Sequence, residues 1–413
     1  MKSKTIVILG GGIGGIVTAN RLRKLLPVNH RIVLIEKNSY NSFAPSYLWV
    51  MNGDRKPEKI VRDVKHFVNP GIEVFHSEVK EIIPAARAVK LEDRTQGYDY
   101  LVIAMGSEMV FDNIQGLDED VLTYYTLDGA IKVKEAISSF TGSKIAIVIC
   151  SLPYRCPAAP YEGALLISEY FRKKDTNNKI EISLFTPEPY PMPVGGPQLG
   201  ELVKQTIKSK GIEYHPLYRL SSIDKQNLQI HFENKESYNY DLLIVIPPHK
   251  GSPVLKESGM ANETSYVPVD PLTLKTWHEN VYALGDASAI SIPGKWKPDV
   301  NMMLPKAGVF AHSQAKIIAN NIAVEITGKG EMKTFCGDGY CMLEAGEGVS
   351  GFAYGNFYGT PNPQVKLKKL GRIWHWGKIL FEMWWLASPG FKKTLLGWIL
   401  NIGGKILGIK IDL

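Results

Sequence analysis

Residues 5–36 read TIVILGGGIGGIVTANRLRKLLPVNHRIVLIE, and this stretch decides the fold. A β-branched run leads into Gly10, Gly12 and Gly15, spaced as G-x-G-x-x-G, and a helical segment and a second apolar run follow. Glu36 ends the second run about 20 residues after the last glycine, where a ribose-binding carboxylate is expected. Together these features predict a βαβ unit that binds an adenine dinucleotide. The alternative is a glycine-rich turn in an unrelated α/β domain.

Residues 144–174 have the layout of a second such unit, but their turn has different chemistry. A buried strand is expected at 144–149 and a helix over 161–173. The turn between them reads CSLPYRCPAAP, with two cysteines, three prolines and no glycine. A pyrophosphate needs glycines so that the backbone can approach it at a helix N-terminus. A later strand ends in Thr186 without an acid for a nicotinamide nucleotide ribose. We therefore expect the layout of an NAD-binding unit without its binding chemistry.

The bulk composition is that of a globular protein. The chain has 413 residues, 45% of them hydrophobic, which is enough for two or three domains. Four cysteines are too few for a secreted disulfide scaffold. No apolar run reaches the roughly 18 residues of a membrane span, and the N-terminal run leads into the glycines rather than a signal-peptide cleavage site. The cysteine spacings, C-x5-C and C-x4-C without nearby histidines, predict no metal site.

Two further segments resemble the closing parts of an FAD domain in two-domain flavoproteins of the disulfide-reductase type. They are YDYLVIAMG (98–106) and NVYALGDA (280–287). The resemblance implies FAD rather than NAD in the first unit, with an aspartate on the ribityl chain. A strand followed by a turn aspartate is the alternative. The cofactor-binding residues expected on this basis are Gly10, Gly12, Gly15, Glu36, Val79, Gly106, Gly285, Asp286 and Lys306.

Lys306 stands where a loop enters a long helix within residues 299–323, and we expect that helix N-terminus to face the flavin ring. A solvated lysine is the alternative. The predicted fold is α/β with two Rossmann-like dinucleotide-binding domains and a C-terminal α+β region that associates with a membrane. The predicted domains are an FAD-binding domain (1–107 and 268–329), a second Rossmann-like substrate and disulfide domain (108–267) and the C-terminal domain (330–413).

The C-terminal tail carries the charge of the whole protein. Residues 364–413 hold nine basic and two acidic residues, which equals the net charge of +7, and five of the eight tryptophans. In a helix, Phe391, Trp398 and Ile406 share one apolar stripe, with Gly403 and the glycine after it expected to break the helix in two. Aromatic and aliphatic residues flanked by lysines favour a helix that lies in a membrane surface. A helix packed on the body or a dimer contact is the alternative, and nucleic acid is disfavoured because no reader motif accompanies the charge.

Five motifs together resemble the sulfide:quinone oxidoreductase and flavocytochrome c sulfide dehydrogenase flavoproteins. They are the glycine motif with Glu36, RCPAAPYEGA (155–164), NVYALGDA (280–287), MLPKAGVFAHSQAK (303–316) and GYCMLE (339–344). The resemblance covers nearly the whole chain and implies a redox-active disulfide between Cys156 and Cys341 beside FAD, with Glu162 as a proton acceptor. The additional Cys336, close to Cys341, leaves that pairing open.

The resemblance implies that sulfide attacks the disulfide, leaves a persulfide on Cys156 and frees Cys341 as a thiolate, and that FAD passes the electrons onward. The basic, tryptophan-rich tail favours membrane quinone as the acceptor and a peripheral membrane protein. The candidate quinone-binding residues are Phe352, Phe357 and Trp376, with a place in the protein core as the alternative for each. A flavocytochrome c subunit and a type II NADH:quinone oxidoreductase are the alternative functions, and a homo-oligomer is possible.

Overall fold

The computed structural model describes residues 2–174, 180–409, 411 and 413. The N-terminal stretch forms the predicted βαβ unit at the centre of a five-stranded parallel sheet of order β20-β9-β1-β2-β5. Its strands are buried because helices α1 and α7 cover one face of the sheet and a small antiparallel sheet with α6 (Pro253–Glu257) covers the other. The elements of this part are β1 (Thr5–Leu9), α1 (Ile13–Leu25), β2 (Arg31–Glu36), β5 (Glu73–His76), β9 (Tyr100–Ile103), β20 (Val281–Ala283) and α7 (Gly308–Thr327).

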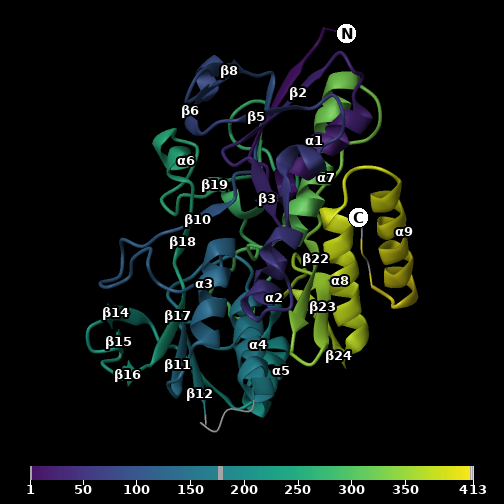
Figure 1. Cartoon of the computed structure of the whole chain (residues 1–413). Coiled ribbons are helices and arrows are strands. Elements are labelled where there is room, and N and C mark those ends of the chain that lie inside the picture. The colour runs from purple at the N-terminus through teal and green to yellow at the C-terminus, as the bar shows by residue number, and fades with distance from the viewer. Residues whose placement is uncertain (1, 175–179, 410, 412) are drawn as a thin grey trace.

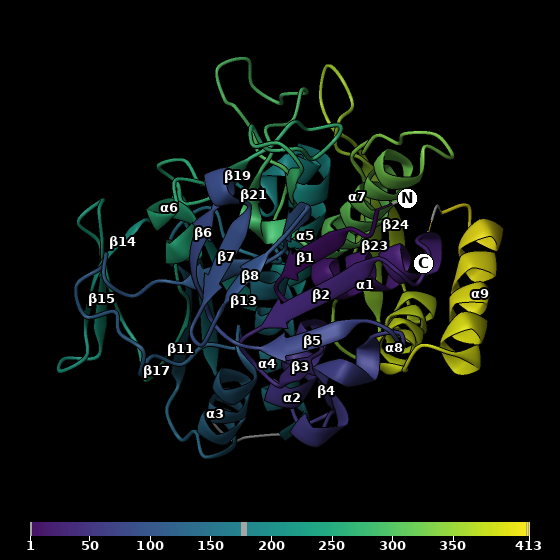
Figure 2. The same ribbon diagram turned by 90° about the horizontal axis from the view of Figure 1, so that it is seen from above.

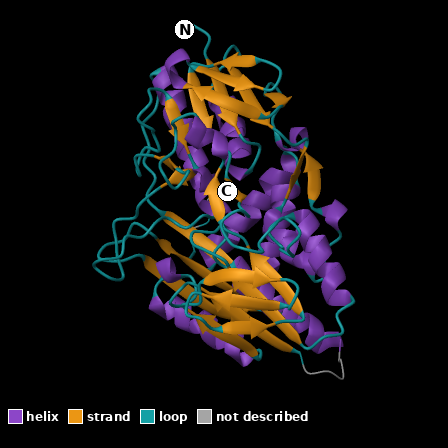
Figure 3. Cartoon of the chain, turned by 90° about the vertical axis from the view of Figure 1, so that its left-hand side faces the viewer, coloured by secondary structure: helices purple, strands orange, loops and turns teal. Residues whose placement is uncertain are grey.

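A second parallel sheet of order β13-β12-β11-β17 contains the cysteine- and proline-rich turn. Figure 1 shows it below the first sheet, and Figure 3 shows the two sheets at opposite ends of the molecule. The predicted helix after the turn begins slightly earlier than expected. The elements are α3 (Leu127–Ser138), β11 (Lys144–Ile149), α4 (Ala159–Lys174), β12 (Glu181–Thr186), α5 (Pro197–Ser209), β13 (Ile212–Pro216) and β17 (Leu242–Ile246).

Small antiparallel and two-stranded sheets complete these two parts. Three of them have two strands: β3 (Tyr40–Ser42) with β4 (Val61–Asp63), β10 (Ser107–Met109) with β18 (His249–Gly251), and β19 (Val267–Pro268) with β21 (Ser288–Ala289). Two of them have three strands: β6 (Val79–Ile83), β7 (Ala88–Leu91) and β8 (Thr95–Gly97), and β14 (Leu220–Asp224), β15 (Gln229–Phe232) and β16 (Ser237–Asn239). Two short helices are α2 (Tyr47–Met51) and α6 (Pro253–Glu257). The predicted α/β fold with two parallel sheets is confirmed, whereas the domain boundaries stay a prediction.

The C-terminal region is an antiparallel three-stranded sheet followed by two helices on the flank of the molecule (Figure 1). Its elements are β22 (Asp338–Glu344), β23 (Ser350–Asn356), β24 (Gln364–Gly371), α8 (Arg372–Leu386) and α9 (Phe391–Ile406). Helix α8 is fixed to the body by Glu382, whose carboxylate accepts hydrogen bonds from Ser46 at 2.7 Å and from Arg55 at 3.1 Å. The C-terminal sheet packs through β22 against α4 and α7, one helix from each of the two α/β parts.

Helix α9 is the outermost element seen from above in Figure 2. The expected break at Gly403 and Gly404 is wrong, because α9 continues through both. Gly404 is buried, and the following chain packs on it, with Ile409 O 3.2 Å from where a Cβ would lie. Leu396 and Leu400 face the body and are buried, so tertiary packing outweighs the roughly 1 kcal/mol that each glycine costs a helix. None of the helices among the described residues is long and apolar enough to cross a bilayer.

Candidate active site

The three glycines of the N-terminal motif have different tasks. A Cβ on Gly10 would lie 2.4 Å from Ala104 O, and one on Gly15 would lie 1.8 Å from Gly10 O. Gly10 also has a φ of +101°, which side chains rarely adopt. A Cβ on Gly12 would meet nothing within 4 Å, and no side chain caps α1 there. The first and third glycines therefore permit close packing, while Gly12 leaves the helix N-terminus open to an anion.

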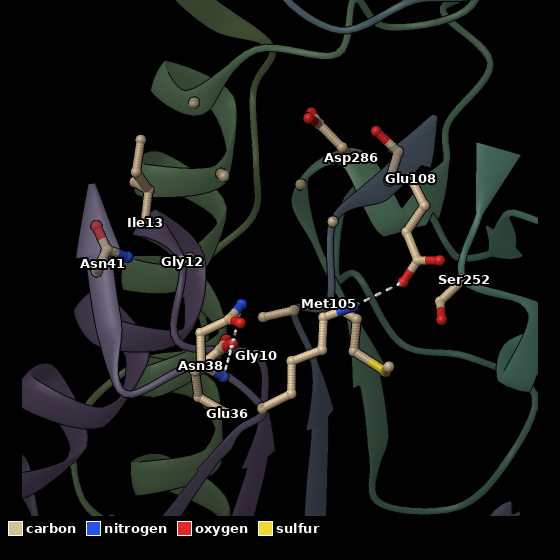
Figure 4. A pocket seen from close by; sticks show the side chains of 18 of the residues that line it. Gly10, Gly12, Ile13, Glu36, Asn38, Asn41, Met105, Glu108, Ser252 and Asp286 are labelled. Atoms are coloured by element: carbon tan, nitrogen blue, oxygen red, sulfur yellow. Dashed lines mark hydrogen bonds and ion pairs between the residues drawn. The ribbon is translucent and has the colours of Figure 1, made fainter. Parts of the chain in front are cut away.

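Gly12 opens into a cavity of about 440 Å³, which we call the glycine-loop cavity. Figure 4 shows Glu36 and Asn38 at one end of it and Asp286 at the other. The Glu36 carboxylate is held by the Gly11 amide at 2.6 Å and the Asn38 amide at 2.9 Å. The predicted cofactor-binding residues in its lining are Gly10, Gly12, Glu36, Val79, Gly106, Gly285 and Asp286. The long, polar-ended shape of this lining suits a nucleotide.

A second, largely apolar cavity of about 350 Å³ adjoins the first and contains both predicted redox cysteines, so we call it the cysteine cavity. The two cavities are direct neighbours, because several residues line both, among them Gly12, Arg155, Asp286 and Gly308. Cys156 comes from the turn before α4 and Cys341 from the middle of β22. The fold thus brings together two cysteines that are far apart in the sequence.

The two thiols are half-buried and line a largely apolar cavity. Cys156 has a φ of +54°, and its amide donates to Lys306 O at 2.7 Å. All four cysteines of the chain are free thiols in this structure. Burial raises the pKa of Cys156 to about 12, and Glu162 adds to this while Lys378 opposes it. Burial also raises the pKa of Cys341, and the neighbouring Cys156 thiol contributes. The dithiol pair is therefore neutral at neutral pH.

Glu162 is held in a buried ion pair on the wall of the cysteine cavity. Its Oε1 accepts hydrogen bonds from Lys378 Nζ at 2.7 Å and from the Glu344 amide at 2.9 Å. The Glu344 carboxylate lies 3.9 Å from Lys378 Nζ and also accepts from Ser350 at 2.7 Å and pairs with His375 at 2.9 Å. Burial alone would lower the pKa of Lys378, but Glu162 and Glu344 together raise it. Lys378 is therefore a charged ammonium inside the protein.

A third cavity of about 490 Å³ lies beside the cysteine cavity. We call it the proline-loop cavity, because residues 189–195 form part of its wall. Tyr154, Met192, Trp296 and Phe357 line it, and so does Cys341. Cys341 therefore stands between the proline-loop cavity and the cysteine cavity and lines both.

Comparison with known proteins agrees with this geometry. The family model described as "Pyridine nucleotide-disulphide oxidoreductase" matches residues 4–315. The chain belongs to the pyridine nucleotide-disulphide oxidoreductase family. It is 25% identical to a sulfide-quinone reductase of Aquifex aeolicus, over 97% of this chain and 96% of that protein. It is 27% identical to a mitochondrial sulfide:quinone oxidoreductase of Dictyostelium discoideum, over 77% and 70%. The crystal structure of the Aquifex aeolicus sulfide:quinone oxidoreductase superposes with a TM-score of 0.85 at 24% identity, over 97% and 95%.

Membership of this pyridine nucleotide-disulphide oxidoreductase family implies a flavin cofactor. The residues that line the neighbouring glycine-loop and cysteine cavities fit a flavin nucleotide. The open helix N-terminus at Gly12 suits phosphate, and the cysteine cavity places the sulfurs beside the remaining space. Ala307 and Gly308, at the start of α7, line the cysteine cavity, and that this helix N-terminus faces the ring stays a prediction. Lys306 is buried rather than solvated, and its Nζ donates to Ser288 O. Burial lowers the pKa of Lys306 to about 8, with Asp286 opposing.

The structure separates the three aromatic residues predicted for quinone binding. Phe352 is fully buried and stacks on Trp374 at 4.9 Å between ring centroids. Phe357 lines the proline-loop cavity, and Trp376 is 62% exposed on α8. The aromatic wall of the cysteine cavity comes instead from residues that sequence reasoning missed. They are Phe43, Tyr47, Tyr124, Tyr125, Tyr340, Phe381, Trp384 and Trp385. Lys378, Phe381 and Trp385 are spaced at i, i+3 and i+7, so the helical period was a signal that they share one face.

Proposed function

We propose that this protein is an FAD-dependent sulfide:quinone oxidoreductase that binds peripherally to a membrane and passes the electrons of sulfide to quinone. One observation carries the proposal: Cys156 and Cys341 line one cavity, and it shares lining residues with the cavity at the glycine motif. The turn that would hold NADH also lacks its glycines, and Tyr154 is buried within it. Glu36 would hold the ribose of the adenine dinucleotide FAD and Asp286 would hold its ribityl chain, since both line the glycine-loop cavity, and FAD would supply two-electron redox chemistry when bound.

The reaction begins on a disulfide between Cys156 and Cys341. Both sulfurs are bonded to one another in that disulfide, so neither is a thiolate and the incoming hydrosulfide supplies the first nucleophile. Cys341 lines both the proline-loop and the cysteine cavities, so we place the attack on Cys341, the reverse of the order that the family resemblance implies. Cys156 leaves as the thiolate, and the nearby Lys378 ammonium favours its charge.

The electron acceptor is a quinone that enters the cysteine cavity from the side of α8. Phe381 and Trp384 offer an apolar wall for its ring, and Lys378 is placed to stabilise negative charge as it is reduced. Glu162, paired with Lys378, is the nearest carboxylate to exchange protons there. A flavocytochrome c subunit passes electrons to a cytochrome and needs no such apolar opening, and we therefore favour quinone.

Anaerobic titration of the purified holoprotein tests this function. Sulfide is expected to bleach the visible flavin absorbance, and a soluble quinone analogue is expected to restore it. NADH at the same concentration is expected to cause no bleaching, because the turn 150–158 offers no glycine-lined approach for a pyrophosphate. Rapid bleaching by NADH would instead identify a type II NADH:quinone oxidoreductase, and bleaching by sulfide without quinone reoxidation would favour the cytochrome-linked alternative.

The exposed face of α9 is the surface that we propose binds the membrane. Phe391 is 83% exposed, Trp398 61% and Ile406 78%, and Lys392 and Lys405 flank them. Burying about 60 Å² of one ring is worth about 1.5 kcal/mol at about 25 cal/mol per Å², or about tenfold in partitioning. An apolar face with flanking lysines suits the interface of an anionic bilayer.

Trp398→Ser and Phe391→Ser are each expected to weaken binding to anionic phospholipid vesicles about tenfold in co-sedimentation. Trp277→Ser is the matched control, since Trp277 is 58% exposed in a loop before β20. The soluble-quinone activity of all three variants is expected to stay unchanged. Equal vesicle binding by Trp398→Ser and the control would contradict the assignment of α9.

A further inference from the structure

A carboxyl group that the mechanism above does not use lies buried behind the turn 150–158. Glu188 is 3% exposed and follows β12. Its Oε2 accepts hydrogen bonds from Tyr154 Oη at 3.1 Å, from Thr186 Oγ1 at 3.3 Å and from Tyr161 Oη. No cation forms an ion pair with Glu188 within the part of the chain that the structure describes. Three hydroxyl donors on one oxygen hold the carboxyl in a fixed position.

The groups that surround Glu188 leave its protonation sensitive to pH near neutrality. Burial raises the pKa of Glu188 to about 7, against the hydrogen bonds from Tyr161, Tyr154 and Thr186. The titratable groups that face it are the phenols of Tyr154, Tyr161 and Tyr214, from the turn, α4 and β13. Burial raises the pKa of each of these phenols, so they stay neutral donors. Glu188 is therefore the group in this cluster that changes charge near pH 7.

Glu188 and Tyr154 line the proline-loop cavity, whose wall also includes Cys341. The rest of that wall is mainly apolar, with Leu152, Met302 and Phe357 among its members. An apolar space admits neutral hydrogen sulfide more readily than the hydrosulfide anion, because a charge loses its hydration there. Attack on a disulfide nevertheless requires the anion. The cavity thus needs a base, and Glu188 supplies a carboxylate in its lining. Lys297 and Lys306 also line the cavity, but the Nζ of Lys306 donates to Ser288 O and lies over the Tyr266 ring.

We propose that Glu188 removes the proton from hydrogen sulfide in the proline-loop cavity, so that hydrosulfide forms next to Cys341. The proposal rests on the proposed function and names the group that accepts a proton from sulfide, the electron donor. The carboxylate takes one proton and becomes a carboxylic acid, and hydrogen sulfide becomes hydrosulfide. The hydrosulfide sulfur then bonds to Cys341 Sγ, the Cys156–Cys341 bond breaks, and its electron pair leaves with Cys156 as a thiolate.

This assignment gives the two buried carboxylates separate tasks. Glu162 lines the cysteine cavity and is neutralised by Lys378 at 2.7 Å, whereas Glu188 lines the proline-loop cavity and is bound only by neutral donors among the interactions described. Cys341 stands between them. Glu188 therefore accepts the proton released from sulfide, while Glu162 and Lys378 act in the reduction of quinone.

Stopped-flow reduction of the holoenzyme flavin by sulfide tests the role of Glu188 across pH 6 to about 8.5, a range set around its pKa. The wild-type rate is expected to be bell-shaped with a maximum near neutrality, because the reaction needs both carboxylate and neutral hydrogen sulfide. Glu188→Gln keeps an oxygen for the phenols and is expected to be about 100-fold slower at its pH optimum. Its rate is expected to rise with pH without an alkaline fall, since hydrosulfide alone then reacts.

Glu169→Gln is the matched control. Like Glu188, Glu169 is a buried carboxylate, but it lies on α4, where it pairs with Lys173 and accepts a hydrogen bond from the Glu347 amide, and it does not line the proline-loop cavity. It is expected to keep the wild-type rate and bell shape. Glu188→Gln is also expected to keep the wild-type rate of reoxidation by a quinone analogue. A Glu188→Gln rate within about twofold of wild type, or an equal loss in both half-reactions, would overturn the proposal.

A measurement on the wild-type enzyme serves where Glu188→Gln does not fold. The infrared difference spectrum on mixing with sulfide is expected to show a buried carboxyl gaining a proton before the flavin is reduced. Absence of that band overturns the proposal while sulfide still bleaches the flavin. If sulfide does not bleach the wild-type flavin at all, the proposed function itself fails, and the two failures are thereby distinguished.

Discussion

Cys341→Ser is expected to slow flavin reduction by sulfide at least about a thousandfold, and Cys156→Ser is expected to do the same. A disulfide needs both sulfurs, and losing either member of a covalent catalytic pair removes the whole pathway rather than a fraction of it. Both residues line the cysteine cavity, so no other cysteine is placed to substitute. Stopped-flow absorbance under anaerobic conditions gives the rate, and dithionite reduction shows that each variant retains its flavin.

The remaining cysteines supply the controls. Cys336 is exposed, and its Sγ donates to Thr334 O at 3.5 Å, outside the cysteine cavity. Cys150 is buried in a separate apolar cluster, where burial raises its pKa. Cys336→Ser is expected to be as active as wild type, and Cys150→Ser is expected to retain sulfide oxidation with lower stability. Full activity in Cys341→Ser together with its loss in Cys336→Ser would move the redox role to Cys336.

The parts of the site that sequence could predict are those that depend on local spacing. The glycine motif and Glu36 lie within one βαβ unit, so the spacing alone places them at one end of a cavity. Gly285 and Asp286 follow a strand whose neighbours are set by the fold, and they line the same cavity. Cys156 and Cys341 were paired through the family resemblance rather than through spacing, because nothing local joins a turn before α4 to β22.

The parts that sequence missed are single residues whose meaning depends on distant partners. Lys378 stands in an apolar helix, where a lysine usually extends to solvent, and its partner Glu162 lies 216 residues away. Glu188 stands in a Pro-rich loop with no motif, and its role depends on Tyr154 and Tyr161 from the turn and α4. For the same reason the sequence leaves two alternatives for Lys306, a place beside the flavin ring and a lysine in solvent. Burial, which decides each case, is a property of the packed structure.

Lys378→Met is expected to destabilise the folded protein by about 3 kcal/mol and to lower Tm by about 3–4 °C. The Lys378 and Glu162 side chains are 7% and 4% exposed, so removing the ammonium leaves a buried carboxylate without its cation. Glu344, 3.9 Å away, loses the same charge and keeps His375 as its partner. Thermal unfolding of the holoprotein measures the loss, and quinone reoxidation is expected to slow in parallel.

A double variant separates the unpaired charge from the loss of packing. Glu162→Gln in the Lys378→Met background removes the stranded carboxylate and is expected to recover at least half of the lost stability, because breaking a buried pair costs more than replacing both partners. Lys393→Met is the matched control: Lys393 packs over Trp384 with its Nζ on the Trp385 and Ala387 carbonyls, and burial lowers its pKa to about 8. Removing that ammonium strands no carboxylate, so Lys393→Met is expected to change Tm little. Equal losses in Lys378→Met and Lys393→Met, without recovery in the double variant, would show that α8 gains its stability from packing alone and that the Glu162–Lys378 pair adds nothing to it.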